Sequence, residues 1–422
     1  MSTRTRHPII FRVGAACLIA LGPGAASAAG FQLRELSAEG LGNAFAGNTA
    51  KATDLSTVYL NPAGMAHVEG SQVQGDLSAV VPTINFSGSA TSPFGTPYTG
   101  GDGGDAGQDV VVPSFYGVWE INPTVKAGLS VNVPFGLSTK YDDDWVGRYF
   151  AIESEIQNMV ITPSISWQAT EQLSLGAGIQ IGHADATLSN AVNLVGLGFP
   201  AGTPDGYSKV SGSDYGYGYT LGMLYEFSPT SRIGLSYRSR IEYTLDGELS
   251  LDGIPGAQDV DAEADLTTPD VLSLGAYHEL NPKWAVMGEV SWTNWSLFEE
   301  MRIEFDDGRA DQVTVEDWDD SLFFALGADY KHAEDHTFHF GIAYDQSPVP
   351  DEHRTARIPD SDRYWVSLGY SYDFSEKGTL NLGYTHLFFD GSDIDETMDV
   401  GNLSGDYSGG ADIFAASVRY RF

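Results

Sequence analysis

Polar and apolar residues alternate with a period of two from about residue 72 onward, and this pattern limits the fold more than any other feature. The segment "VKAGLSVNVPF" places apolar residues at every second position and Lys126, Ser130 and Asn132 between them. The same alternation recurs in "QLSLGAGIQIGHA", "SRIGLSYRSRIEY" and "KWAVMGEVSW". Successive side chains of a strand point to opposite faces, so these segments are predicted to be strands with one apolar face. We therefore expect an all-β fold.

The connections between these segments alternate between short and long. Short turns are predicted at 122–124, 170–172, 228–230, 281–283, 332–335 and 375–377. Long polar stretches such as "GSATSPFGTPYTGGDGGDAGQ" and "GSDIDETMDVGNLSGDYSGG" lie between them. A soluble β-sandwich also alternates, but short turns at one end and long loops at the other are typical of bacterial outer-membrane barrels. Six hairpins, a first strand near 72–87 and a last strand near 411–422 give about fourteen strands, an even number as such barrels require.

Aromatic residues on the apolar face cluster beside the short turns, where the membrane meets water. They are Trp119, Trp167, Phe227, Trp284, Tyr330 and Phe374. The chain ends in "SVRYRF", and a final strand that ends in Phe resembles the assembly signal of outer-membrane barrels. We predict that residues 72–422 form an antiparallel transmembrane β-barrel of about fourteen strands in the outer membrane of a Gram-negative bacterium.

Residues 1–28 are predicted to be a secretory signal peptide. The basic stretch "MSTRTRHPIIFR" precedes the short apolar run "VGAACLIAL", and "ASA" fits a small-x-small cleavage site. The single cysteine, Cys17, lies in this leader. We therefore expect no disulfide and no thiol chemistry in the mature chain.

Composition and motifs argue against several classes of function. The chain has 22 basic and 57 acidic side chains, a net charge of −35, whereas nucleic-acid binding needs a basic surface. The hydrolase, metalloprotease and P-loop motifs are absent, so we expect no enzymatic activity and no cofactor. His332, His336 and His339 fall in or beside a predicted short turn, and the Asp/Gly runs lack a calcium-loop spacing, so no metal site is predicted. Some outer-membrane barrels are lipid hydrolases or proteases, but no convincing Ser/His or Asp/His constellation supports that alternative.

Residues 29–71 precede the first strand and do not alternate. They are rich in Gly and Ala, and "NPAG" predicts a tight turn. A barrel of fourteen strands is wider than its own side chains can fill. We predict that residues 29–71 form a hatch, or plug, inside the lumen; the alternative is a disordered periplasmic leader.

The predicted hatch carries a family resemblance. "AGFQLRELSAEGLGNAFAGNTAKATDLSTVYLNPAGMA" resembles the N-terminal hatch of the FadL family, the outer-membrane long-chain fatty-acid transporters. "PFGLSTKYDDDWVGRY" resembles the segment that follows the third strand in that family. The resemblance implies a fourteen-strand barrel that takes up hydrophobic molecules passively. Ligand would be caught by external loops, held beside the hatch and released sideways through a gap at a kink in the third strand.

The resemblance also implies roles for individual residues. Phe31 matches a hatch phenylalanine that touches ligand. The hatch turn would comprise Asn61, Pro62 and Ala63, and the kink would comprise Pro134, Phe135 and Gly136. Pro removes a ladder donor and Gly bends easily, so a break there is physically reasonable. Alternatively, Pro134 only ends the strand before its loop.

A fatty acid carries a carboxylate, so inward-facing cations matter in this acidic chain. If the odd-numbered residues of "SRIGLSYRSRIEY" face lipid, Arg238 and Arg240 point into the lumen. Two readings are open: these arginines bind the carboxylate through charge-assisted bonds, or they pair with lumen acids that hold barrel and hatch together. The acids considered are Glu226, Glu242, Glu289 and Asp345.

The loop 190–202 is unusually apolar for an outer loop. Leu194, Leu197 and Phe199 are candidates for an external hydrophobic groove, because exposed apolar clusters often mark binding sites. The alternative is that this loop packs over the barrel mouth.

The identity of the ligand stays open at this level. Long-chain fatty acids and monoaromatic hydrocarbons such as toluene are both carried by related channels, and a general porin for polar solutes is a further alternative. The expected partners are these small molecules together with outer-membrane lipids and lipopolysaccharide, and the chain is expected to work as a monomer.

Overall fold

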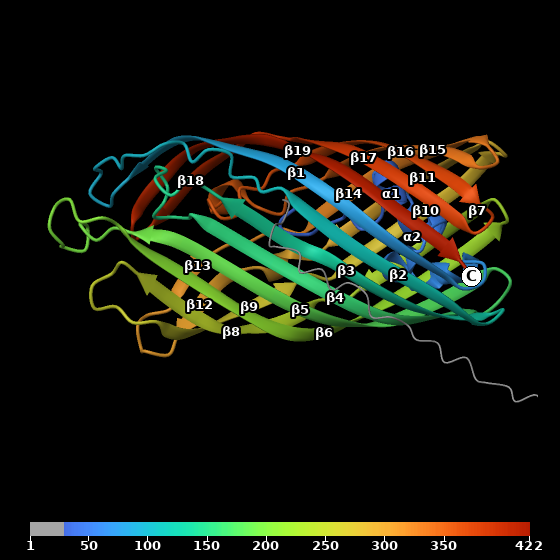
Figure 1. Cartoon of the computed structure of the whole chain (residues 1–422), viewed down its shortest axis with the longest axis horizontal. Coiled ribbons are helices and arrows are strands. Elements are labelled where there is room, and N and C mark those ends of the chain that lie inside the picture. The colour runs from blue at the N-terminus through green and yellow to red at the C-terminus, as the bar shows by residue number, and fades with distance from the viewer. Residues whose placement is uncertain (1–28) are drawn as a thin grey trace, which may run out of the picture.

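The computed structural model describes residues 29–422, so the predicted signal peptide and Cys17 lie outside the described residues. Four short helices precede the first strand: α1 (Ala38–Gly42), α2 (Asn48–Lys51), α3 (Thr57–Leu60) and the 3-10 helix η1 (Pro62–His67). They lie inside the barrel, toward the end that holds the C-terminus (Figure 1). In the described part of the chain, no helix is long and apolar enough to cross a membrane.

The strands follow in chain order, with two further 3-10 helices among them. They are β1 (Gln72–Thr91), β2 (Val110–Asn122), β3 (Val125–Lys140), β4 (Glu153–Gln168), β5 (Leu173–Val192), β6 (Gly206–Ser228), β7 (Ser231–Arg238), β8 (Ile241–Asp252), β9 (Val260–Thr268), β10 (Val271–Asn281), β11 (Trp284–Thr293), η2 (Trp295–Leu297), β12 (Glu300–Phe305), β13 (Gln312–Val315), β14 (Ser321–Ala333), β15 (His336–Asp345), η3 (Asp351–His353), β16 (Arg363–Ser375), β17 (Gly378–Phe389), β18 (Ser392–Met398) and β19 (Gly401–Arg421).

These segments form a closed antiparallel barrel of 14 strands, as predicted. Five barrel strands are interrupted, so β7 and β8, β9 and β10, β11 and β12, β13 and β14, and β17 and β18 each belong to one strand. The barrel closes where β1 pairs with β19 over its whole length, from Gln72 opposite Arg421 to Thr91 opposite Asn402. This closure pairs the first strand with the last, which an outer-membrane barrel needs because lipid offers no hydrogen bonds to an open sheet.

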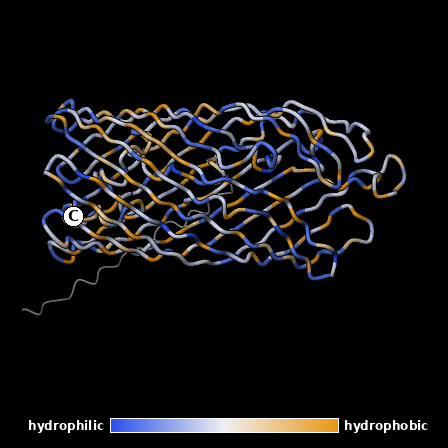
Figure 2. Tube along the Cα trace, turned by 180° about the vertical axis from the view of Figure 1, so that it is seen from behind, coloured by the Kyte–Doolittle hydropathy of each residue, from blue (hydrophilic) through white to orange (hydrophobic). Residues whose placement is uncertain are grey.

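Hydrophilic and hydrophobic residues alternate along the strands (Figure 2), and their exposure assigns them to opposite sides of the wall. Leu77, Leu274 and Leu326 are exposed on the outside, whereas Ser78, Ser291 and Thr385 are buried against the lumen. One predicted boundary is wrong: residues 391–410 are β18 and the first half of β19, not a loop. The outward face of this hairpin is polar, whereas Ile394, Leu403 and Tyr407 pack inward, so the ladder continues where the apolar outer face stops.

Glycines in the wall let the hatch backbone approach closely. A Cβ atom at Gly222 of β6 would come 2.1 Å from Oδ1 of Asn61, and one at Gly341 of β15 would come 2.1 Å from the backbone of Asn43. Only glycine leaves this space. The hatch is therefore seated directly on the backbone of the wall.

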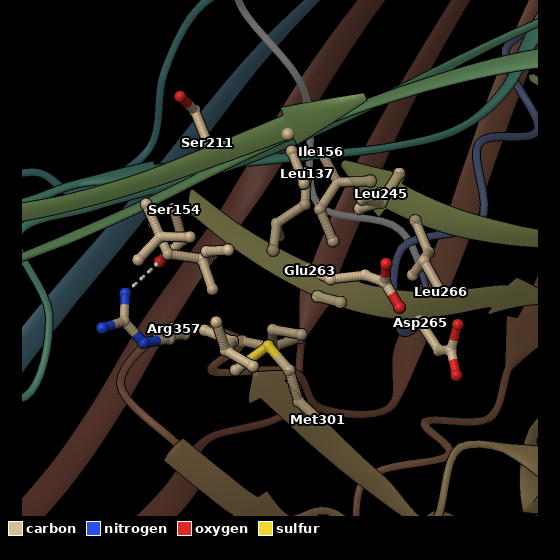
Figure 3. Close-up of a pocket in the computed structure, with 18 of the residues that line it drawn as sticks. Leu137, Ser154, Ile156, Ser211, Leu245, Glu263, Asp265, Leu266, Met301 and Arg357 are labelled. Atoms are coloured by element: carbon tan, nitrogen blue, oxygen red, sulfur yellow. Dashed lines mark hydrogen bonds between the residues drawn. The ribbon is translucent and has the colours of Figure 1, made fainter. Parts of the chain in front are cut away.

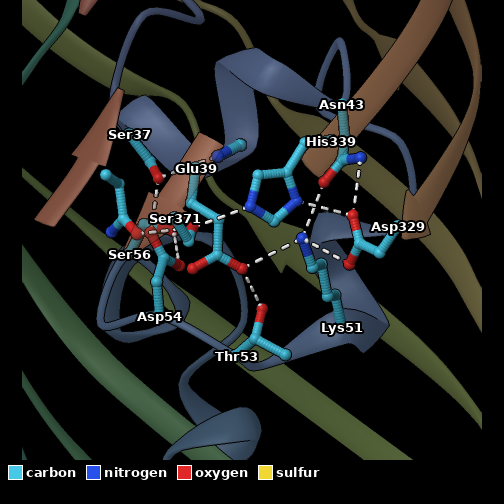
Figure 4. Close-up of polar contacts among 12 residues, drawn as sticks. Ser37, Glu39, Asn43, Lys51, Thr53, Asp54, Ser56, Asp329, His339 and Ser371 are labelled. Carbon is cyan, nitrogen blue, oxygen red and sulfur yellow. Dashed lines mark hydrogen bonds and ion pairs between the residues drawn. The ribbon is translucent and has the colours of Figure 1, made fainter. Parts of the chain in front are cut away.

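A buried ionic network also fixes the hatch to the barrel (Figure 4). Lys51 Nζ lies 2.9 Å from Glu39 Oε1 within the hatch and 3.1 Å from Asp329 Oδ2 of β14. His339 of β15 contacts the other oxygen of Asp329 at 2.6 Å. Burial alone would raise the pKa of Glu39, but the nearby Lys51 ammonium outweighs it and lowers that pKa to about 2. Glu39 is therefore ionised at neutral pH, and the network carries real charges.

Candidate ligand-binding site

The wall is incomplete along one side of β3. The β2–β3 ladder ends where Phe115 faces Val131, and the register of β3 against β4 shifts between Asn132 and Phe135. Pro134 lies inside this bulge, where its missing N–H costs no ladder bond. On the C-terminal side of the bulge, β3 keeps its pairing with β4 but has no β2 partner. The resulting gap is bounded at its outer end by the bridge between Gly107 and Thr139.

The start of the hatch covers this free edge like a short extra strand. Leu33 N donates to Pro134 O at 2.8 Å, and Gly136 N donates to Phe31 O at 2.8 Å. Gln32 and Phe135 form the bridge between these two bonds. Residues 31–33 therefore cover the part of the β3 edge that has no β2 partner.

Phe31 sits at the centre of a buried aromatic cluster. Its ring centroid lies 4.6 Å from that of Trp295, 5.9 Å from those of Phe298 and Trp318, and 6.0 Å from that of Phe135. Most pairs meet edge to face, the arrangement that aromatic rings prefer. The cluster lies where β11 and β13 are interrupted, since Trp295 and Phe298 follow β11 and Trp318 precedes β14.

Asp360 in the loop that joins β15 and β16 holds the residue before Phe31. Gly30 N donates to Asp360 Oδ2 at 2.8 Å. Gly30 has φ +59°, and a Cβ there would come 2.6 Å from Trp318. The same loop therefore contacts the hatch and, as described next, lines a cavity.

An apolar cavity lies outward of the aromatic cluster (Figure 3). Its lining is mostly aliphatic and includes Leu137, Ile156, Ala186, Leu188, Val210, Leu245, Leu266, Phe298, Met301, Ile303 and Ile358. Phe298 belongs both to this lining and to the cluster around Phe31. The volume is about 60 Å³, so the cavity is a narrow slot that has to widen to accept a bulky molecule.

A buried arginine stands at one end of the slot. Arg357 Nη1 contacts Ser154 Oγ and Ser189 O, each at 3.3 Å, and Nη2 contacts Asn190 Oδ1 at 3.5 Å. These bonds are long, and no carboxylate among residues 29–422 lies within 4.0 Å of this guanidinium. Arg357 also lines a polar cavity nearer the outer loops, together with Tyr149, His353 and Asp395. It therefore stands between a polar cavity and an apolar slot.

The two arginines selected from the sequence do not share an environment. Arg238 is buried in the lumen with its guanidinium stacked over Tyr59, 3.8 Å from the ring centroid. Arg240 is partly exposed and pairs with Asp270 at 2.8 Å. The prediction that both arginines face the lumen is wrong. The strand is interrupted between Arg238, where β7 ends, and Ile241, where β8 begins. Ile241 is buried, so the alternation shifts at this interruption. Neither arginine pairs with the lumen acids considered from the sequence.

The side chain of Asn61 makes three hydrogen bonds that hold the predicted hatch turn. Asn61 Oδ1 accepts from Ala63 N at 3.1 Å and so caps η1, while Nδ2 donates to Thr49 O at 2.7 Å and Met223 O at 3.0 Å. Pro62 occupies the first turn of η1, where its missing N–H costs nothing. This turn holds two parts of the hatch against β6.

The loop after β5 lies apart from these cavities. Leu194 is buried, Leu197 is 66% exposed and Phe199 is partly buried. None of the three lines the apolar slot.

Sequence reasoning missed Arg357 and the tryptophans of the cluster. Arg357 lies in a loop, where strand alternation gives no direction to a side chain. The run "WTNWSLF" does lose its alternation after Trp292, and this loss was the available signal for an inward turn of Trp295 and Phe298.

Comparison with known proteins agrees with this architecture. Residues 19–422 match the family model of the outer membrane protein transport proteins (OMPP1/FadL/TodX). The chain belongs to this family. As a family member it is an outer-membrane channel for hydrophobic substrates and not an enzyme.

Relatives within the OMPP1/FadL/TodX family span nearly the whole chain. It is 31% identical to the "47 kDa outer membrane protein" of Pasteurella multocida, with 96% of this chain and 97% of that protein covered. It is 27% identical to the "Long-chain fatty acid transport protein" of Escherichia coli K12, with 93% and 94% covered. Among solved structures, a Pseudomonas aeruginosa FadL homologue superposes with a TM-score of 0.88 at 27% identity, covering 93% of this chain and 100% of that one. The Pseudomonas putida toluene transporter TodX shares the fold at 19% identity, with a TM-score of 0.67 and 94% and 100% covered.

Proposed function

We propose that this channel admits long-chain fatty acids. One observation carries the proposal: an apolar slot ends at Arg357, a buried guanidinium with no carboxylate within 4.0 Å among residues 29–422. A buried charge without a partner is costly, and a carboxylate head group would satisfy it with charge-assisted bonds. A neutral aromatic hydrocarbon would leave the guanidinium with only the longer-range attraction of Glu316 and Glu396, neither of which contacts it.

The route we propose has three stages. The fatty acid enters through the polar outer cavity and places its head group on Arg357 and its alkyl chain in the slot. The chain then reaches the cluster around Phe31. Displacement of residues 31–33 from β3 uncovers the unpaired edge, and the molecule leaves sideways into the membrane. The barrel closes through one chain, which supports a monomer as the working unit.

Substitution of Arg357 tests the choice of ligand. In cells that lack their own fatty-acid channel, Arg357→Gln should raise the half-saturating concentration for oleate uptake about tenfold or more, as expected for a lost charge-assisted bond. Uptake of toluene should be unchanged. Arg302→Gln is the matched control, since Arg302 lies between the lining residues Met301 and Ile303 and pairs outside the slot with Glu300 and Asp311. Oleate uptake that is equal in both variants would refute the proposal and favour a hydrocarbon channel.

A further inference from the structure

A second, smaller cavity lies deeper in the lumen, between the hatch and the wall. We call it the inner cavity. Its polar lining residues are Gln32, Arg34, Asn48, Thr49, Arg238, Ser273, Glu289 and Ser291. Its volume is about 40 Å³, which holds roughly three water molecules at one per 10–15 Å³, or one small polar group.

Hydrogen-bond donors outnumber acceptors in this cavity. Arg238 is 91% buried, and its Nε has no hydrogen-bond partner among residues 29–422. Within the described part of the chain, the one hydrogen bond of its guanidinium is from Nη2 to Tyr59 O at 3.5 Å. Asn48, which is equally buried, likewise leaves Nδ2 without a partner in the described chain.

The other charged groups of the cavity do not supply a partner for Arg238. Glu289 is engaged by the backbone N–H and the hydroxyl of Thr49. Arg34 adds a second guanidinium, which stacks over Phe323 and lies 3.8 Å from Asp345. Two cations and a free amide therefore surround a space with one carboxylate that is already bonded.

We infer that the inner cavity is a second carboxylate site, which receives the head group of the cargo after it leaves Arg357. This inference rests on the proposed function. Guanidinium groups bind carboxylates in a planar fork, and Arg34 and Arg238 present two such groups to one small space.

The position of Arg34 gives this site a consequence for release. Arg34 directly follows residues 31–33, which cover the free edge of β3. Its Nη2 also holds Gln32 Oε1 at 3.2 Å. A carboxylate that binds Arg34 competes with this contact and with Asp345. Arrival of the head group thereby loosens the segment that closes the side opening.

Uptake kinetics separate the two sites. Arg238→Gln should lower the maximal rate of oleate uptake about tenfold, the size expected for one charge-assisted bond, and leave the half-saturating concentration near that of the wild type. Arg240→Gln is the matched control. Arg240 is two residues from Arg238 in the sequence, and its guanidinium pairs with Asp270 outside the inner cavity. Uptake of decanol, which has no carboxylate, should be unchanged in both variants.

Each outcome has a distinct meaning. If Arg238→Gln matches the wild type while Arg357→Gln is impaired, the inner cavity holds only water and the inference is wrong, but the proposed function survives. If neither variant affects oleate uptake, the proposed function fails as well. Arg238→Lys guards against a folding defect: with a lysine that keeps the charge, the maximal rate should recover in part. A rate in Arg238→Lys no higher than in Arg238→Gln would assign a packing role to Arg238 and overturn the site.

Discussion

Burial of one carboxyl group, Glu35, makes the seating of the hatch depend on pH. Burial raises the pKa of Glu35 to about 7, and Oε2 has no hydrogen-bond partner among residues 29–422. The seated hatch therefore holds this proton more tightly than the released chain does. The free energy that favours the seated hatch is largest below the ordinary pKa of a glutamate and decreases as the pH rises toward 7. By about pH 8 the contribution of Glu35 to this free energy has fallen by about 3 kcal/mol.

Glu35→Gln should remove the part of this dependence that Glu35 contributes. At pH 8.5 the amides of α1 should exchange hydrogen more slowly in the variant than in the wild type, because the wild type has to bury a charge. At pH 4 the two proteins should exchange nearly alike, since the wild-type carboxyl is then protonated in the seated hatch and largely protonated in the released chain. Comparison at equal pH cancels the intrinsic pH dependence of exchange. A difference of the same size at both values would show that Glu35 acts through packing and not through its charge.

At the scale of elements, the strands were predictable and their partners in the lumen were not. Alternation and turn spacing located the hairpins, and the proline in "VPFG" pointed to a break in β3. The pairing of Gln32 with Phe135 joins residues about a hundred positions apart, and no local pattern encodes it. The side chain of Arg240 was also misplaced by local reasoning. Its inward direction was deduced from the alternation along one strand, and the interruption of that strand reverses the alternation. Local periodicity determines an element, whereas the site arises from contacts between distant elements.

Cross-linking the hatch to β3 tests whether this pairing closes the exit. Gln32→Cys combined with Phe135→Cys should form a disulfide, because the two residues face each other in the bridge and the described chain has no native cysteine to interfere. Under oxidising conditions oleate uptake should fall to background, and reduction should restore it. The two single variants control for loss of the side chains. Uptake that continues in the cross-linked protein would mean that cargo leaves by another path.

At the scale of the whole molecule, the barrel and the hatch differ in what stabilises them. The barrel is a closed ladder in which every strand has two neighbours, so its integrity does not depend on the hatch. The hatch has only four short helices of its own and relies on wall glycines, the Asn61 turn and the Lys51 network. Helices this short are not stable alone. Contacts with the wall therefore decide whether the lumen is plugged.

Removing the central cation should unseat the hatch without unfolding the barrel. Lys51→Met leaves Glu39 and Asp329 buried without their partner, a change that typically costs about 3–5 kcal/mol. In planar bilayers the variant should show steady ion conductance where the wild type stays closed, while its strand content by circular dichroism is unchanged. Adding Glu39→Gln and Asp329→Asn to the same variant removes the uncompensated charges and should restore closure in large part. If the triple variant conducts as much as Lys51→Met, the hatch is held by the shape of Lys51 and not by its charge.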